Sequence, residues 1–461
     1  MNTAFDSLTH KMQRAALGKT VDLVLSHAEK DPAKTVGQIV DLSKQFYGDS
    51  FSDETYAHAK QTLTDPDSKW SKLINCMLNQ LDPNVARTTA LNLGYEAFFR
   101  GTKTIRENRV KYQCNVPWLI LFDPTSACNM HCVGCWAGEY GNKNNLSFDD
   151  MDKIVSQGKE LGVYLYMLTG GEPLLFPDFK TLYRRLRNLG MILTINTNGT
   201  LLDEAWADFF ATYPPRRINI TLYGADAASY DRLCHFPQGF DQTLRAVRLL
   251  RARNVDVKIS CSVTKKNPQD FSRIFALGKE LGVPVHADHY MMPAVRERSL
   301  PFDAQVRLLP EDAAALAFQA LKLQLDADIF RQYVRESVRR VNDPAFPRGD
   351  GHISCLAGNC SFFINWQGRL FPCVMLSELS APAFDLGFLA AWEMVSAKAR
   401  SLSLSTKCRQ CRFRPICRTC AAASFLETGS YQGAPDYLCR YAEHYYNLLL
   451  AELASFSSDP S

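Results

Sequence analysis

The sequence predicts an α/β protein whose core is a partial (β/α)6, TIM-like barrel. An all-helical N-terminal domain precedes the core, and a loop-rich, cysteine-rich C-terminal domain follows it. Three observations predict this arrangement. Short apolar runs alternate with helix-length amphipathic segments from about residue 117 to 289. Before them, apolar residues recur at helical spacing, and after about residue 351 cysteines accumulate.

Length and composition are those of an ordinary soluble protein of about three domains. The chain has 461 residues, of which 46% are hydrophobic and 22% charged. No apolar run is long enough for a membrane span, and residues 1–19 lack the apolar core of a secretory signal, so we expect a cytoplasmic protein. The 52 basic and 48 acidic side chains are too balanced to indicate a nucleic-acid partner.

Residues 1–112 are expected to be helical, with Pro and Gly sparse and no chemical motif. This N-terminal domain is interpreted either as a packing domain or as one that grips a substrate or partner.

The predicted barrel domain covers residues 113–300. Strands separated by helices of this length form right-handed βαβ units and a parallel sheet. Six units are too few to close an eight-stranded barrel, so an open barrel is expected, with its reactive edge at the C-terminal ends of the strands. The strands are expected at 118–122, 163–168, 191–195, 217–223, 255–263 and 283–289. The helices between them are expected at 148–161, 179–189, 202–211, 240–253 and 271–281.

Two further domains complete the prediction. A helical linker is assigned to 301–350, with its helices at 311–341. The cysteine-rich domain is assigned to 351–461 and ends in an apolar helix at 441–456.

The 15 cysteines indicate metal ligands rather than disulfides, because their number is odd and no secretory signal is evident. Four are scattered and fit small buried hydrophobes: Cys76, Cys114, Cys234 and Cys261. Eleven fall into two groups: Cys128, Cys132, Cys135; and Cys355, Cys360, Cys373, Cys408, Cys411, Cys417, Cys420, Cys439.

The first group lies in one loop, directly after the first predicted strand. Cys128, Cys132 and Cys135 are separated by three and by two residues. Such a loop can wrap three corners of an iron–sulfur cube and leave the fourth iron open to a substrate or cofactor. Taken alone, three cysteines are also compatible with zinc.

The second motif, Thr169-Gly170-Gly171-Glu172-Pro173, directly follows the second predicted strand. Paired glycines let a backbone approach a ligand closely, and the glutamate adds an acceptor. Together, the two motifs resemble the radical S-adenosylmethionine (SAM) superfamily. The resemblance implies a [4Fe–4S] cluster whose open iron is chelated by the methionine part of SAM, with Gly170, Gly171, Glu172 and Pro173 receiving its amino group.

The resemblance also implies three less specific contacts to SAM. Family members often carry an aromatic residue just before the third cysteine, where this chain has Gly134; Trp136 is the substitute ring. Asn198, in the loop after the third strand, and Ser260, on the fifth, occupy positions near the cofactor in relatives. Ordinary turn and strand chemistry explains both equally well.

The second cysteine group resembles the SPASM extension of peptide-modifying radical SAM enzymes. The resemblance implies two auxiliary [4Fe–4S] clusters. The first is assigned to Cys355, Cys360, Cys373 and Cys420, and the second to Cys408, Cys411, Cys417 and Cys439. The alternative is a zinc knuckle formed by the two Cys-x2-Cys pairs at 408–420, whose basic loop suggests nucleic-acid binding when taken alone. Arginines are equally expected beside an anionic iron–sulfur cluster.

By resemblance, the chain is expected to be an oxygen-sensitive radical SAM oxidoreductase or maturase. A reducing donor such as ferredoxin or flavodoxin supplies an electron, SAM is cleaved to a 5′-deoxyadenosyl radical, and that radical abstracts a substrate hydrogen. The auxiliary clusters then accept an electron as a peptide or protein substrate is oxidised or cross-linked. No protein side chain is assigned as catalytic.

Three alternatives stay open. The substrate is a small molecule or lipid, or the chain is a multi-cluster electron carrier or redox sensor. The Gly-Gly-Glu-Pro turn disfavours a carrier, which has no need of a SAM pocket. A thiol is a further candidate as hydrogen donor, either Cys234 or Cys261. Cys261 alternates with Ser260 along one strand, so only one of the two faces the barrel interior.

Overall fold

We analysed a computed structural model of the protein. It describes residues 12, 14–23, 26, 32–47, 51–68, 70–71, 87, 91–92, 97, 101–113, 115–135, 144–294, 297–346, 355 and 357–456.

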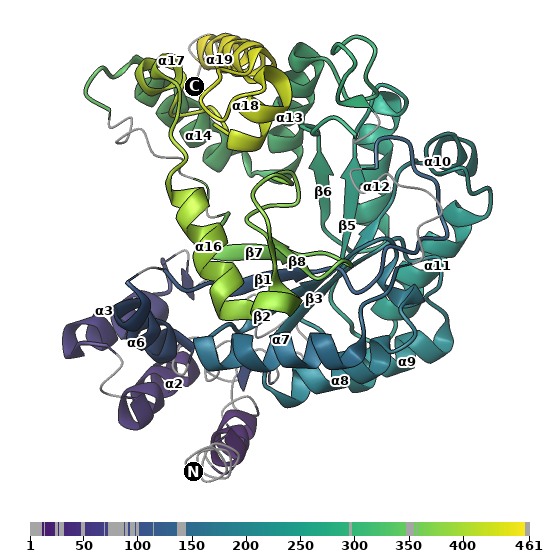
Figure 1. Ribbon diagram of the computed structural model, residues 1–461. Coiled ribbons are helices and arrows are strands. Elements are labelled where there is room, and N and C mark those ends of the chain that lie inside the picture. The colour runs from purple at the N-terminus through teal and green to yellow at the C-terminus, as the bar shows by residue number, and fades with distance from the viewer. Residues whose placement is uncertain are drawn as a thin grey trace.

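One sheet of nine strands, in the order β6-β5-β4-β3-β2-β1-β7-β8-β9, organises the described part of the chain (Figure 1). Its first six strands run parallel and lie in sequence order, which confirms the predicted βα core. They are β1 (Leu119–Phe122), β2 (Leu165–Leu168), β3 (Ile192–Thr197), β4 (Arg217–Thr221), β5 (Val257–Ser262) and β6 (Val285–Asp288).

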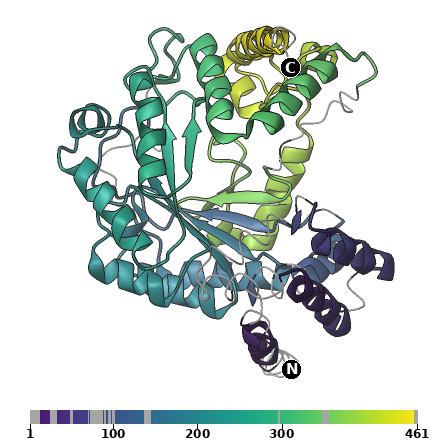
Figure 2. The ribbon, with the colours of Figure 1, turned by 180° about the vertical axis from the view of Figure 1, so that it is seen from behind.

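Side chains alternate between the two faces of this sheet, as strand geometry requires. On β5, Ile259 and Cys261 are buried, whereas Lys258, Ser260 and Ser262 are partly exposed. The buried face packs against helices (Figure 2), and the half-exposed face lines the barrel interior. Those helices are α7 (Phe148–Leu161), α8 (Phe179–Asn188), α9 (Glu204–Thr212), α10 (Ala227–Cys234), α11 (Gly239–Arg251) and α12 (Phe271–Glu280).

Five of these helices confirm the sequence prediction, but α10 was not expected. It has eight residues, too few to display a full amphipathic repeat. Its start is nevertheless encoded locally. The Asp226 side chain accepts a hydrogen bond from the Ser229 backbone, and the Ser229 side chain accepts one from the Asp226 backbone. This reciprocal cap satisfies backbone donors that the first turn leaves unpaired.

The cysteine-rich part of the chain contributes three strands to the same sheet, which the sequence did not predict. β7 (Ser361–Ile364) pairs in parallel with β1, so the barrel has a seventh parallel strand. β8 (Arg369–Phe371) and β9 (Ala381–Pro382) continue the sheet antiparallel. The sequence did not predict β7, because its pairing partner β1 lies far away in the chain and no short sequence pattern indicates that pairing.

In the described residues that follow the barrel, seven more helices are present. Two occupy the segment predicted to be helical, α13 (Pro310–Gln324) and α14 (Ala327–Asn342), and both lie beside the last helix, α19 (Asp436–Ser455) (Figures 1 and 2). α19 starts five residues before the predicted start, so it includes Cys439. The remaining four are α15 (Ala383–Leu386), α16 (Phe388–Arg400), α17 (Thr406–Gln410) and α18 (Ala421–Thr428). On α16, the buried Trp392 ring packs edge-on against Phe362 of β7, 6.4 Å between centroids.

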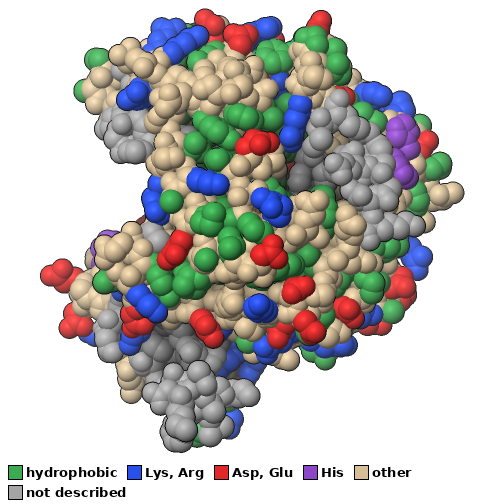
Figure 3. Space-filling model, in the orientation of Figure 1, with side chains coloured by type: hydrophobic (Ala, Val, Ile, Leu, Met, Phe, Trp, Pro, Cys, Tyr) green, Lys and Arg blue, Asp and Glu red, His purple; other side chains and the backbone are tan. Residues whose placement is uncertain are grey.

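The N-terminal segment shows α2 (Pro32–Tyr47), α3 (Asp53–Thr64) and α6 (Thr102–Tyr112), and no strand among its described residues. α6 contacts the barrel directly, because the Asn108 side chain donates to the carbonyls of Glu160 and Leu161 at 3.2 and 3.1 Å. Figure 3 shows Lys and Arg interspersed with Asp and Glu over the visible face. Within the described residues, no helix is long and apolar enough to cross a membrane.

Candidate functional site

The loop after β1 carries the three clustered cysteines. Cys128 is exposed, and Cys132 and Cys135 are half-buried. Two backbone hydrogen bonds join this loop to the end of α10, from His131 to the Cys234 carbonyl at 3.2 Å and from Val133 to the Leu233 carbonyl at 2.7 Å. The missed helix α10 therefore supports the cysteine loop.

A thiol and a phenol lie against Cys132. Hydrogen bonds with Cys234 and Tyr223 lower the pKa of Cys132, whereas burial acts to raise it. Cys234 is fully buried and was interpreted from sequence only as a small hydrophobe or a hydrogen donor. Its position next to Cys132 could not be seen in the sequence, because the two residues lie on different βα units.

The Gly-Gly-Glu-Pro turn is fastened to the same loop. The Gly171 amide donates to the Thr125 carbonyl at 3.0 Å, and the Glu172 amide donates to the Ala127 carbonyl at 2.7 Å. A Cβ on Gly171 would lie 2.3 Å from the Ala127 oxygen. Gly170 has a φ of +129° and equally little space. The two glycines are therefore required for the turn to approach the loop backbone.

The Glu172 side chain is buried at the ends of β2 and β3. Its Oε1 accepts from the Thr197 hydroxyl at 2.7 Å and the Leu174 amide at 3.1 Å, and its Oε2 accepts from the Asn198 amide at 2.8 Å. Burial raises the pKa of Glu172 to about 7. A carboxylate offers about four acceptor positions, so one remains on Oε2. Pro173 begins a short 3₁₀ turn, Pro173–Leu175, and is buried.

Asn198 also joins this assembly. Its side chain donates to Asn129 of the cysteine loop at 2.9 Å, and Asn129 in turn donates to the Thr200 hydroxyl at 2.9 Å. The structure thus brings Gly170, Gly171, Glu172 and Asn198 together around the loop that carries Cys128.

Ser260 lies on the barrel-facing side of β5, paired in register with Thr221 and His286. Cys261 points the other way and is packed in the hydrophobic core. Cys261 is therefore wrong as a hydrogen donor inside the barrel. Trp136 lies outside the described residues. Gly134 adopts a φ of +82°, and a Cβ there would lie 2.9 Å from the Val306 side chain, which leaves no room for an aromatic residue.

Asp123, at the end of β1, was missed by the sequence analysis. It is fully buried, and neither carboxylate oxygen has a hydrogen-bond partner. Burial raises the pKa of this carboxyl well above its usual value. It lies beside the turn, since a Cβ on Gly170 would be 3.6 Å from the Asp123 Cβ. Its one sequence signal is its place between an apolar strand and the cysteine loop.

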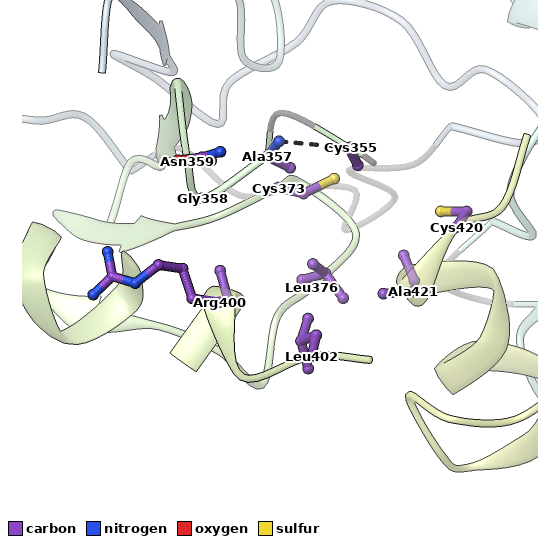
Figure 4. Close-up of a pocket in the computed structure, with 12 residues that line it drawn as sticks. Cys355, Ala357, Gly358, Asn359, Cys373, Leu376, Arg400, Leu402, Cys420 and Ala421 are labelled. Carbon is purple, nitrogen blue, oxygen red and sulfur yellow. Dashed lines mark hydrogen bonds between the residues drawn. The ribbon is translucent and has the colours of Figure 1, made fainter. Parts of the chain in front are cut away.

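The C-terminal cysteines surround two cavities. The first, of about 360 Å³, is lined by Cys355, Cys373 and Cys420. Figure 4 shows these residues on three separate segments, with the Cys373 and Cys420 thiols facing each other. Backbone amides of Ala357 and Met375 lie 3.4 and 3.5 Å from the sulfurs of Cys355 and Cys373. Cys360 does not line this cavity.

The second cavity, of about 240 Å³, is lined by Lys407, Arg414 and five cysteines of the group, of which Cys420 also lines the first cavity: Cys408, Cys411, Cys417, Cys420 and Cys439. Among the described side chains, no group of three or more His, Cys, Asp or Glu is arranged to hold a single metal ion.

Comparison with known proteins identifies the class. Residues 122–278 match the model of the Radical SAM superfamily. The chain is 27% identical over 345 residues to an AdoMet-dependent heme synthase of Methanosarcina barkeri, covering 71% of this chain and 97% of the relative. It is 26% identical over 340 residues to a protein of the same name from Oleidesulfovibrio alaskensis, covering 70% and 87% of the two chains.

Solved structures share the fold. SuiB of Streptococcus suis, bound to its precursor peptide SuiA, aligns with a TM-score of 0.58 at 18% identity, covering 74% of this chain and 80% of SuiB. The structure entitled native anSMEcpe with bound AdoMet aligns with a TM-score of 0.57 at 18% identity, covering 74% and 99%. The protein is an enzyme with a Radical SAM domain at residues 122–278, and this domain binds a [4Fe–4S] cluster and SAM.

Proposed function

We propose that this enzyme uses SAM to oxidise a tetrapyrrole and that its reaction centre lies at the C-terminal ends of β1, β2 and β3. Cys128, Cys132 and Cys135 hold the [4Fe–4S] cluster. When bound there, the cluster and SAM supply a 5′-deoxyadenosyl radical able to take hydrogen from an unactivated carbon. These thiols fit the cluster because one loop presents all three, each at least partly exposed.

The residues around this loop position SAM. The turn Gly170–Pro173 offers its backbone at close range, and the remaining acceptor position on Glu172 Oε2 suits an ammonium group. Asn198 and Ser260 line the approach from β3 and β5. Ionised Glu172 binds an ammonium group more strongly than neutral Glu172 does, so binding of the methionine amine opposes the effect of burial on its pKa.

Two auxiliary clusters are proposed for the C-terminal cavities. Each cavity gathers thiols from separate segments, and the second is flanked by Lys407 and Arg414, which stabilise an anionic cluster. Clusters held by these cysteines would supply an acceptor for the electron that substrate oxidation releases. A reduced ferredoxin or flavodoxin supplies the electron that starts the reaction.

The proposal of a tetrapyrrole substrate rests on one observation. The alignment with the M. barkeri heme synthase spans 97% of that protein. The likeness to SuiB, at 18% identity, concerns the fold alone and supports no peptide substrate. A small cyclic substrate agrees with the barrel interior, whose β3–β5 side chains are polar and partly exposed, as Asn196, Asn219 and Ser260 illustrate.

The test is radical formation by the anaerobically reconstituted enzyme. Iron coproporphyrin III, which another relative's name identifies as its product, is supplied with SAM and a reductant. We expect 5′-deoxyadenosine to form in proportion to the tetrapyrrole consumed. If SAM is cleaved and the tetrapyrrole neither stimulates cleavage nor is consumed, the substrate class is rejected.

Two cysteine variants provide matched controls. Cys135→Ala should abolish 5′-deoxyadenosine formation because the cluster loses a ligand. Cys261→Ala should retain it, since that thiol is buried on the opposite face of β5. Equal loss in both variants would show that the effect comes from misfolding and would contradict the assignment of Cys135.

A further inference from the structure

A layer of polar side chains crosses the barrel interior next to Ser260. The strand register places Asn196 of β3 beside Asn219 of β4, and Asn219 beside Lys258 of β5. All three side chains are partly exposed and alternate with buried neighbours along their strands, so they lie on the face that lines the barrel. Lys258 therefore supplies a positive charge to the barrel interior, one inward-facing position before Ser260.

Lys258 has no counter-ion in the described part of the chain. Its ammonium group forms neither an ion pair nor a hydrogen bond there. Asp256, the neighbouring carboxylate on the same strand side, pairs instead with Arg216 at 2.5 Å and with Arg217 at 3.1 Å. Asp288 acts on Lys258 through its charge but does not pair with it. The charge of Lys258 is therefore left unmatched by a direct contact.

The surroundings of Lys258 oppose its positive charge. Burial and the charge of Arg217 lower the pKa of Lys258, whereas Asp288 acts to raise it. A half-buried cation without a partner loses hydration that no protein group replaces. An anion that enters the barrel and pairs with the ammonium group compensates for that loss, so this position favours a negatively charged ligand.

The rest of the layer offers hydrogen-bonding groups. The Asn219 amide donates to the Asn196 Oδ1 at 2.7 Å, and no described group donates to the buried Oδ1 of Asn219. The register of β1 and β2 continues the layer to Asp123, whose pKa is raised by burial, so its neutral form is favoured. The layer thus combines polar groups on β1, β3 and β4 with a cationic end at Lys258.

We propose that the Lys258 ammonium group binds a side-chain carboxylate of the tetrapyrrole substrate and thereby sets the orientation of the macrocycle in the barrel. This inference rests on the proposed function. In the sheet, β6 is the edge strand and β5 lies next to it, so Lys258 is close to the open side of the barrel (Figure 1). A charge-assisted hydrogen bond is about twice as strong as a neutral one. The pair therefore selects tetrapyrroles that carry carboxylates and fixes which edge of the macrocycle faces β5.

Binding of two iron porphyrins tests this pair. Iron coproporphyrin III and its amide, in which each carboxylate is replaced by a carboxamide, are titrated anaerobically into the reconstituted enzyme. The change in porphyrin absorption gives each dissociation constant. The wild type should prefer the acid to the amide. Lys258→Met should weaken binding of the acid about tenfold to a hundredfold and leave binding of the amide unchanged. Lys258→Arg should keep the preference, because it keeps the charge.

Three controls separate this role from a general effect of charge or packing. Lys279→Met changes the net charge equally, but Lys279 is exposed in the last turn of α12, so porphyrin binding should be unchanged. Lys258→Gln repeats the test with a polar side chain, so a packing defect of methionine does not decide it. SAM also carries a carboxylate, and its affinity should be the same in Lys258→Met as in the wild type.

The outcomes distinguish this inference from the proposed function. If the neutral Lys258 variants bind the acid as tightly as the wild type, or lose affinity for SAM and not for the acid, the inference is overturned and the substrate class stands. Equal weakening in Lys258→Met and Lys279→Met overturns it as well. If the wild type binds neither porphyrin, the substrate class is rejected and the inference fails with it.

Discussion

Gly171 has no space for a side chain, because its turn packs directly against the cysteine loop. The carbonyl oxygens of Ser126 and Ala127 would lie 2.5 and 2.3 Å from an added Cβ. Both belong to the loop that presents Cys128. The turn therefore depends on the close approach of its backbone to the cysteine loop. The same close approach places the Glu172 carboxylate beside its hydrogen-bond partners.

Gly171→Ala should destabilise the protein by about 1–3 kcal/mol, because the turn must move away from the loop. Iron content after reconstitution should fall with it, measured beside the thermal midpoint. Gly37→Ala is the matched control. That glycine lies inside α2 with only ordinary contacts, so alanine there should be neutral or stabilising by about 0.5–1 kcal/mol. Normal iron content in Gly171→Ala would contradict this account.

Glu172 should make the stability of the apoprotein depend on pH. Its pKa is raised from 4.5 in the unfolded chain to about 7 in the folded protein. The folded state then binds more protons than the unfolded state, so stability is greatest below about pH 4.5 and declines as the pH rises towards about 7. The free energy of unfolding in urea should fall less across this interval in Glu172→Gln than in the wild type. Parallel profiles would refute the assignment.

At the scale of elements, α10 serves the cysteine loop although it carries no proposed ligand. Its last turn accepts the amides of His131 and Val133. Its first turn is capped by Asp226, which also pairs with Arg273 at 2.9 Å. The stability of this short helix should therefore affect the cysteine loop and its cluster, whereas that of α9, which belongs to a different βα unit, should not.

Asp226→Ala should cost about 1 kcal/mol through the lost cap and should also lower the fraction of chains that retain the SAM cluster. Asp203→Ala is the matched control, because Asp203 caps α9 by accepting from the Trp206 amide at 2.9 Å. We expect a similar fall in the thermal midpoint for both variants and a loss of the cluster's visible absorption for Asp226→Ala only. Equal absorption in the two variants would contradict the proposed link between α10 and retention of the cluster.

At the scale of the whole molecule, the C-terminal part is built into the barrel. β7 pairs with β1 along its full length. α19 contacts the end of β6 through the Tyr441 hydroxyl, 3.2 Å from His289, and the segment before α13 through the Tyr437 hydroxyl, which donates to the Leu308 carbonyl at 2.7 Å. The predicted domain boundary near residue 351 therefore lies between parts that share a sheet and a core.

A chain ending at residue 350 should fail to fold cooperatively. It would expose the edge of β1 and the face of α13 that packs against α19, and unpaired edges promote aggregation. We expect an insoluble product, or a broad thermal transition by circular dichroism. A soluble monomer that melts cooperatively near the full-length midpoint would show instead that the barrel is an independent unit.

The elements and motifs that depend on local pattern can be located from the sequence. Short apolar runs between helix-length segments located β1–β6, amphipathic segments located α7, α8, α9, α11 and α12, and the spacing of Cys128, Cys132 and Cys135 identified the loop. Each of these patterns lies within a short stretch of chain, so it can be recognised from local backbone geometry without knowledge of the tertiary structure.

Which distant segments meet depends on the tertiary structure. It paired β7 with β1, put Cys234 and Tyr223 against Cys132, turned Cys261 into the core and left Cys360 outside the cavity lined by Cys355, Cys373 and Cys420. It also buried Asp123 beside the turn. These outcomes depend on burial and packing between residues far apart in the chain, so they cannot be predicted from spacing along the sequence.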